Sequence, residues 1–107
     1  MAPKKNSRVI MTLEQIIINL ENTSNSLTIC VAKSPQWNQM SEAELHPSAQ
    51  VPHGSKLPYF LEVSVAKNVL KAWSFARNGR IPNTEKKCEA LIFYAENDAY
   101  ILPEHER

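Results

Sequence analysis

Apolar residues recur at helical spacing directly after Thr12. Their positions follow the i, i+3, i+4, i+7 pattern of a helix with one buried face: Leu13, Ile16, Ile17 and Leu20. Thr12 and Gln15 match a capping box, in which each side chain binds the other residue's free backbone amide. The pattern predicts a helix that begins at Thr12 and ends in the polar residues 22–26. Ile18, beside this stripe, predicts that the helix is covered on a second side.

Two short segments have the composition of strands. Residues 27–32 and 59–63 are rich in β-branched and aromatic residues, and Pro58 directly before the second segment is tolerated at the start of a strand. Between them, residues 33–56 lose all periodicity and contain several prolines and a glycine, which predicts a long irregular loop. Within this loop, residues 41–45 predict a helical turn and residues 49–51 a short edge strand.

Two further helices follow. Ser64 is the expected N-cap of the first, which ends at Asn78-Gly79 and buries the stripe Val65, Val69, Ala72, Trp73 and Ala76. Asn83 or Thr84 caps the second, whose core positions are Cys88, Leu91, Ile92 and Ala95. Phe93 and Tyr94 flank those positions, so this helix is expected to be central and buried on more than one face. Residues 99–102 predict a last strand.

This order of elements predicts an α+β fold, with three helices packed on a small, mostly antiparallel sheet of three to four strands. A chain of 107 residues is long enough for one core, so residues 11–107 are expected to form a single domain. Residues 1–10 are predicted to be a disordered basic tail.

The charge distribution argues against nucleic-acid binding. The net charge is +1, but three cations and no acid lie in residues 1–10, so the remainder has a net charge of −2. No stretch approaches the roughly 20 apolar residues of a membrane span. Cys30 and Cys88 lie far apart in apolar segments, where free cysteine behaves as a small hydrophobe. We therefore expect a cytoplasmic protein without a structural disulfide.

Two acids, Glu96 and Asp98, lie at the end of the last predicted helix, where the helix dipole favours cations. A structural explanation is that Arg77 or Arg80 pairs with them, and this explanation is favoured because ion-pair networks are common. The alternative is that this acidic corner binds an external cation or a partner. Tyr100, which follows the acids, is grouped with them as a candidate binding residue.

Tryptophan and arginine, which are enriched at binding hot spots, occur together at one predicted helix end, and a second tryptophan lies elsewhere in the chain. Trp73 lies near Arg77 and Arg80, but it falls on the apolar helix face, which favours a core tryptophan beside an arginine at the helix end. Trp37 lies in the long loop, where no periodic pattern assigns it to the core. Recognition of a partner and anchoring of the loop are equally compatible with its position.

Signatures of catalysis are missing. His46, His53 and His105 do not have the spacing of metal ligands, and no cofactor is expected. Gly54 and Gly79, the two glycines of the chain, are too few for a phosphate-binding loop in its usual form. A triad assembled only in three dimensions stays open.

The segment from Trp73 through Arg77, Arg80 and Pro82 to Tyr94, Glu96, Asp98 and Tyr100 resembles the C-terminal half of small uncharacterised bacterial proteins. Some of these occur on mobile gene cassettes or beside toxin genes. The resemblance implies a bacterial cytoplasmic protein and assigns no catalytic residue.

Three functional hypotheses follow. The first is a non-enzymatic, immunity-like binding module that holds a basic protein partner with Trp37 and the acidic corner. The second is a small-ligand protein or minor enzyme, in which Arg77 or Arg80 holds an anion and His46 or His53 does acid–base work. Homo-oligomerisation through a strand edge or an apolar helix face is compatible with either.

Overall fold

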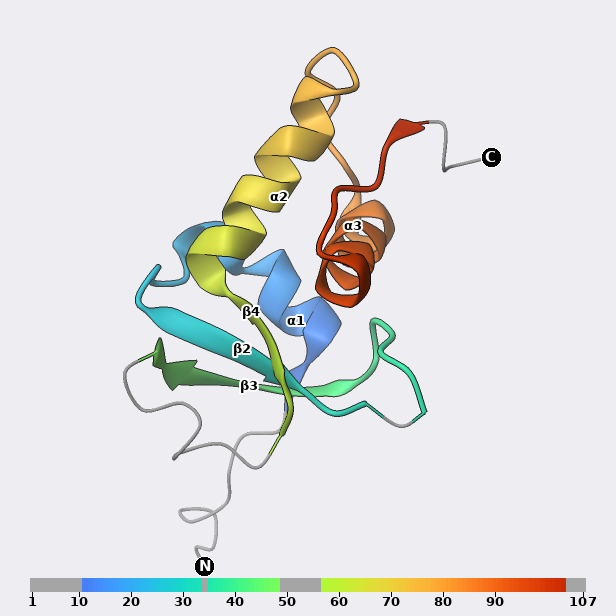
Figure 1. The fold of residues 1–107 in the computed structure, drawn as a ribbon. Coiled ribbons are helices and arrows are strands. Elements are labelled where there is room, and N and C mark those ends of the chain that lie inside the picture. The colour runs from blue at the N-terminus through green and yellow to red at the C-terminus, as the bar shows by residue number, and fades with distance from the viewer. Residues whose placement is uncertain (1–10, 34, 49–56, 104–107) are drawn as a thin grey trace, which may run out of the picture.

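An antiparallel four-stranded sheet with three helices forms an α+β fold in the computed structural model, as predicted (Figure 1). The structure describes residues 11–33, 35–48 and 57–103. The strands are β1 (Met11–Thr12), β2 (Leu27–Val31), β3 (Glu42–Pro47) and β4 (Tyr59–Glu62), in the spatial order β1-β3-β2-β4. The helices are α1 (Leu13–Ile18), α2 (Val63–Phe75) and α3 (Thr84–Asn97), with a short 3-10 turn, η2 (Leu20–Asn22).

The three helices lie on one side of the sheet, and the core lies between the two layers (Figure 1). Helix α3 packs against α1 and α2, and only Cys88, Ala90 and Leu91 of its residues are buried, so the prediction that it is the central helix, buried on more than one face, is wrong. Every helix and three strands contribute fully buried side chains, among them Leu13, Ile17, Ile29, Val31, Ala43, Phe60, Ala66, Val69 and Leu91.

Helix α1 begins as predicted. The Gln15 amide donates to Thr12 Oγ1 at 3.2 Å and the Thr12 amide donates to Gln15 Oε1 at 2.9 Å, which completes the capping box. The predicted stripe is buried, but the prediction for Ile18 is wrong, since its side chain is 57% exposed. The α-helix ends at Ile18, and the following turn η2 brings Leu20 back to the core.

The loop predicted over residues 33–56 is interrupted by a strand. Residues 42–47 form β3, which pairs with β1 on one side and with β2 on the other, from Leu27 opposite Pro47 to Val31 opposite Ala43. The helical turn predicted at 41–45 is therefore wrong. Glu, Ala and Leu favour helices in isolation, but pairing to two strands and burial of Ala43 override this propensity. The strand predicted at 49–51 and the tail predicted at 1–10 lie outside the described residues.

The start of α2 is also corrected. The helix begins directly after β4, with Glu62 rather than Ser64 as its N-cap, and no side chain caps it. Its end agrees with the prediction, because the chain reverses through left-handed conformations at Asn78 (φ 58°) and Gly79 (φ 84°). Val69 and Trp73 of the predicted stripe are buried, whereas Ala76 is exposed.

Helix α3 starts at the predicted cap, where the Asn83 side chain accepts a hydrogen bond from the Lys86 amide at 2.8 Å. The strand predicted at 99–102 is wrong. Asp98 adopts a left-handed conformation that ends α3 and turns the chain, and residues 99–102 then run back without joining the sheet (Figure 1). Ile101 alone of these four residues is buried, and its carbonyl accepts a hydrogen bond from Arg77 Nη2 at 3.3 Å.

Candidate functional site

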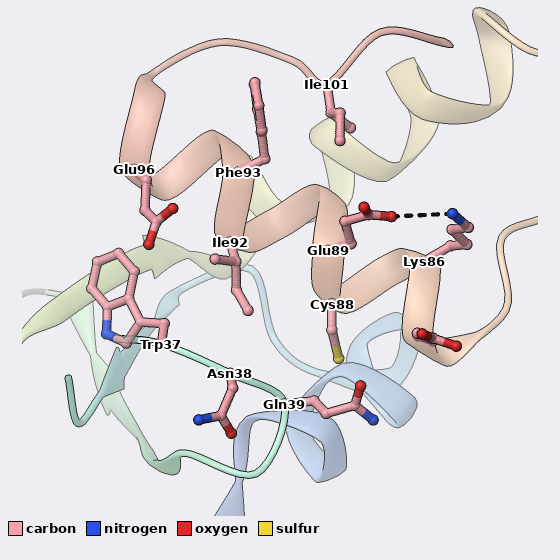
Figure 2. A pocket seen from close by; sticks show the side chains of 11 residues that line it. Trp37, Asn38, Gln39, Lys86, Cys88, Glu89, Ile92, Phe93, Glu96 and Ile101 are labelled. Carbon is pink, nitrogen blue, oxygen red and sulfur yellow. Dashed lines mark hydrogen bonds and ion pairs between the residues drawn. The ribbon is translucent and has the colours of Figure 1, made fainter. Parts of the chain in front are cut away.

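A groove of about 560 Å³ lies between the loop of residues 35–41 and the outer face of α3 (Figure 2). One wall is formed by Trp37, Asn38 and Gln39, and the other by side chains spread along the helix. Two features that the sequence singled out separately, Trp37 and Glu96, therefore lie in one site. Figure 2 shows the Glu96 side chain pointing toward the Trp37 ring.

The helical wall presents a line of carboxylates. Glu85 and Glu89 precede Ile92 by seven and three residues, and Glu96 follows it by four, which places all four on one face of α3. Lys86 Nζ pairs with Glu89 Oε1 at 3.3 Å, and both side chains of this pair are exposed. Glu85 and Glu96 form no ion pair with any residue that the structure describes. The groove therefore has an excess of negative charge beside an apolar floor.

Trp37 is fixed in this groove by three contacts. Its indole Nε1 donates to the Val31 carbonyl at 3.0 Å, and its ring meets Phe60 edge-on at a centroid distance of 4.9 Å. Lys33 Nζ lies over the ring at 4.2 Å, in cation–π geometry. The side chain is half-buried, so Trp37 anchors the loop and also leaves part of its surface on the groove. The two alternatives that the sequence left open are thus both compatible with its position.

The loop itself is held against the start of α1. The Leu13 amide donates to the Ser41 carbonyl and the Glu14 amide to the Gln39 carbonyl, both at 2.9 Å. These amides belong to the first turn of a helix, which leaves its N–H groups without intrahelical partners. Gln39 Nε2 also donates to Glu14 Oε2 at 2.8 Å. Because both walls are tied to helices, the groove is formed before any ligand binds.

The four remaining candidate residues lie outside this groove. Arg77 is 6% exposed, stacks on the Trp73 ring at 4.2 Å and donates to the Trp73 and Ile101 carbonyls. Arg80 is exposed, with its guanidinium 5.9 Å from the same ring. Asp98 forms the left-handed end of α3, and Tyr100 lies 5.5 Å from Tyr94. The Arg–acid pairing favoured by the sequence is not seen for Arg80, since Arg80, Glu96 and Asp98 form no ion pair within the described ranges.

The residues of the alternative pocket hypothesis are not brought together. His46 lies on β3, where its Nε2 is 2.7 Å from Glu44 Oε1. Strand β3 and the C-terminal end of α2, which precedes Arg77, lie at opposite ends of the molecule (Figure 1). His53 and His105 are outside the described residues. Among the side chains that are described, no group of three could hold a metal ion.

The thiol of Cys88 lies at the base of the groove and is buried. Removal from water, with a smaller contribution from the nearby Glu14 carboxylate, raises the pKa of Cys88 to about 11 from its usual 9.0. A thiol with this pKa stays protonated near neutral pH and is a poor nucleophile. Cys88 is therefore not a candidate nucleophile near neutral pH.

We expect Cys88 to make the protein less stable as the pH rises from about 9 to about 11. In this range the unfolded chain has lost the thiol proton while the folded protein still binds it, so the free energy of unfolding falls with pH. Urea unfolding at several pH values should show this slope. In Cys88→Ala the slope should be shallower by the contribution of one proton, and an unchanged slope would contradict the assigned pKa.

Comparisons with protein-family models, with curated proteins and with solved structures found no match to this chain. Within the described residues, no helix is long and apolar enough to cross a membrane.

Proposed function

We propose that this protein is a non-enzymatic binding module whose groove holds a positively charged segment of a protein partner. The observation that supports the proposal is that one preformed groove is lined by Trp37 together with Glu85, Glu89 and Glu96. An aromatic ring beside carboxylates suits lysine and arginine side chains, which have an apolar stem and a charged end.

The charges of the groove favour such a partner. Lys86 offsets one of the three glutamates. Glu85 and Glu96 lie eleven residues apart on the same helix face, about 16 Å along its axis, so a partner segment with two cations suits them better than a single cation. Exposed ion pairs contribute only about 0.2–1 kcal/mol each, so we expect binding that depends on several contacts and weakens with salt.

The aromatic part of the groove already accommodates a cation. Lys33 of the chain itself lies over the Trp37 ring, which shows that an ammonium group fits there. An arginine of a partner could stack on the ring in place of Lys33, and arginine and tryptophan are enriched at binding hot spots. The rigid attachment of Trp37 to Val31 and Phe60 lowers the entropy lost on binding.

An immunity-like role, in which a cytoplasmic accessory protein of a bacterial mobile element binds and neutralises a basic protein, is the functional class that we propose. This class accounts both for the acidic groove and for the resemblance of residues 73–100 to small bacterial proteins that occur on mobile gene cassettes or beside toxin genes. The small-ligand alternative gains no support from the positions of His46 and Arg77.

The proposal is tested with a fluorescein-labelled amphipathic peptide of lysine, leucine and alanine. We expect the wild-type protein to bind this peptide at low salt. In Glu85→Gln/Glu96→Gln the dissociation constant should rise about tenfold, which corresponds to about 1.4 kcal/mol. Fluorescence anisotropy gives the constants, and thermal unfolding checks that the variant is folded.

The matched control is Glu42→Gln/Glu62→Gln, which removes the same charge from two exposed glutamates on β3 and β4 outside the groove. Its affinity should stay within about twofold of the wild type. An equal loss in both variants would mean that the peptide responds to net charge alone, and the proposal would be abandoned.

A further inference from the structure

An exposed phenylalanine lies at the C-terminal end of α2, on the outer face of the helix. Lys67, Lys71 and Phe75 are spaced four residues apart, so they form one line along the helix away from its buried stripe. Phe75, the last residue of the helix, is 88% exposed. Exposing a phenylalanine to this extent keeps most of its apolar surface in water, which suggests a surface that is covered in a complex.

A second exposed apolar side chain faces the same space. Ile81, in the connection between α2 and α3, is 87% exposed. Phe75 and Ile81 form the two rims of a groove of about 440 Å³, with the buried Leu70 and Pro82 at its base. This space, which we call the second groove, is concave and has apolar rims, so it suits a convex ridge such as one face of a helix.

The charges around the second groove are mainly positive. Lys67, Lys71 and Lys87 line it, against one acid, Glu21. Lys67 Nζ is bound to the Thr23 carbonyl at 2.8 Å, whereas Lys71 and Lys87 form no ion pair within the described ranges. Lysines at i and i+4 on one helix repel each other slightly, and a partner with acidic groups would remove that repulsion.

Helix α3 separates the two grooves. Lys87 follows Glu85 by two residues and precedes Glu89 by two, and at about 100° per residue it projects from the opposite side of the helix. The second groove thus has the opposite charge and lies on another surface, and it does not depend on the proposal made for the first groove.

We propose that the second groove binds an acidic amphipathic helix of a protein partner, with leucine-like side chains between Phe75 and Ile81 and carboxylates near Lys71 and Lys87. Shape and charge carry this assignment. The concave form between two helices favours an inserted ridge over a flat anionic membrane, and the lysines favour an acidic ridge over a basic one.

The test uses a fluorescein-labelled peptide with leucines at i, i+3, i+4 and i+7 and with glutamate and alanine elsewhere. The full chain should bind it at low salt. Phe75→Ser/Ile81→Ser should weaken binding about tenfold or more, because both changes remove exposed apolar contacts. Lys71→Gln/Lys87→Gln should weaken it several-fold and reduce its dependence on salt concentration.

Ile18→Ser/Met40→Ser is the matched control, since these apolar side chains are 57% and 63% exposed and do not line the second groove. Its affinity should equal that of the wild type. No binding by the wild-type chain, or an equal loss in the control, overturns the proposal.

Two other measurements distinguish a protein partner from a second copy of this chain and from a membrane surface. If Phe75→Ser/Ile81→Ser abolishes a self-associated species in sedimentation while leaving peptide binding unchanged, a second copy covers the surface and the proposal is overturned. If the same variant instead loses binding to phosphatidylserine-containing vesicles and keeps its affinity for the peptide, a membrane surface is the ligand, which also overturns it. Loss of peptide affinity alone supports it.

Discussion

Arg77→Met is expected to lower the free energy of unfolding by about 3 kcal/mol. Two carbonyls, those of Trp73 and Ile101, would lose a donor in a buried environment, which costs about 1–3 kcal/mol for each unsatisfied group. The guanidinium also stacks on the Trp73 ring at 4.2 Å. Methionine retains the apolar stem and isolates the loss of these polar contacts. Urea unfolding followed by circular dichroism measures the change.

Arg80→Met serves as the control for this prediction. Arg80 is exposed and lies 5.9 Å from the same ring, so we expect a change within about 0.5 kcal/mol. If the two variants were equally stable, Arg77 would not hold residues 99–102 against α2, and its assignment as a structural residue would be withdrawn.

Ile17→Ala should also destabilise the protein by about 3 kcal/mol. Ile17 is fully buried in the layer between α1 and the sheet, and its truncation leaves a cavity in addition to the lost apolar burial. The neighbouring Ile18 is 57% exposed, so Ile18→Ala should change the stability by less than about 0.5 kcal/mol. The two variants make the same chemical change at adjacent positions, so they differ only in the burial of the side chain that is truncated.

The same unfolding measurement decides the orientation of α1. Equal losses in Ile17→Ala and Ile18→Ala would mean that the helix is covered on both sides, as the sequence suggested, and would contradict the exposure of Ile18. Because folded domains are stable by only about 5–15 kcal/mol, a difference of this size is readily measured.

Local sequence patterns correctly predicted the elements in which the local conformational preference of the residues matches the conformation they adopt in the fold. The capping box of Thr12 and Gln15, the Asn83 cap and the Asn78-Gly79 reversal all depend on contacts within a few residues. Strand β3 was missed because its residues favour a helix locally, although Ala43 and Leu45 alternate with Glu42, Glu44 and His46 in the period of a strand. Pairing with β1 and β2 determines its conformation.

The candidate site was predicted only in separate parts. Trp37 and Glu96 are 59 positions apart in the sequence, and no local pattern states that they share a groove. Glu85 and Glu89 were not singled out, although their spacing from Glu96 on one helix was a usable signal. Phe75 was outside the predicted apolar stripe of α2, which was a sign of exposure, but its partner Ile81 had no pattern to indicate it.

The sequence by itself determined the α+β class, the positions of the three helices and two of the strands, and the buried stripe of α1, because these follow from periodicity, caps and turn residues. The tertiary structure alone decided that residues 42–47 join the sheet and that residues 99–102 do not. It also decided that Arg77 is buried, and that α3 separates an acidic groove from a basic one. The physical reason is that strand pairing, burial of a charged group and the joining of distant segments depend on contacts between residues far apart in the chain.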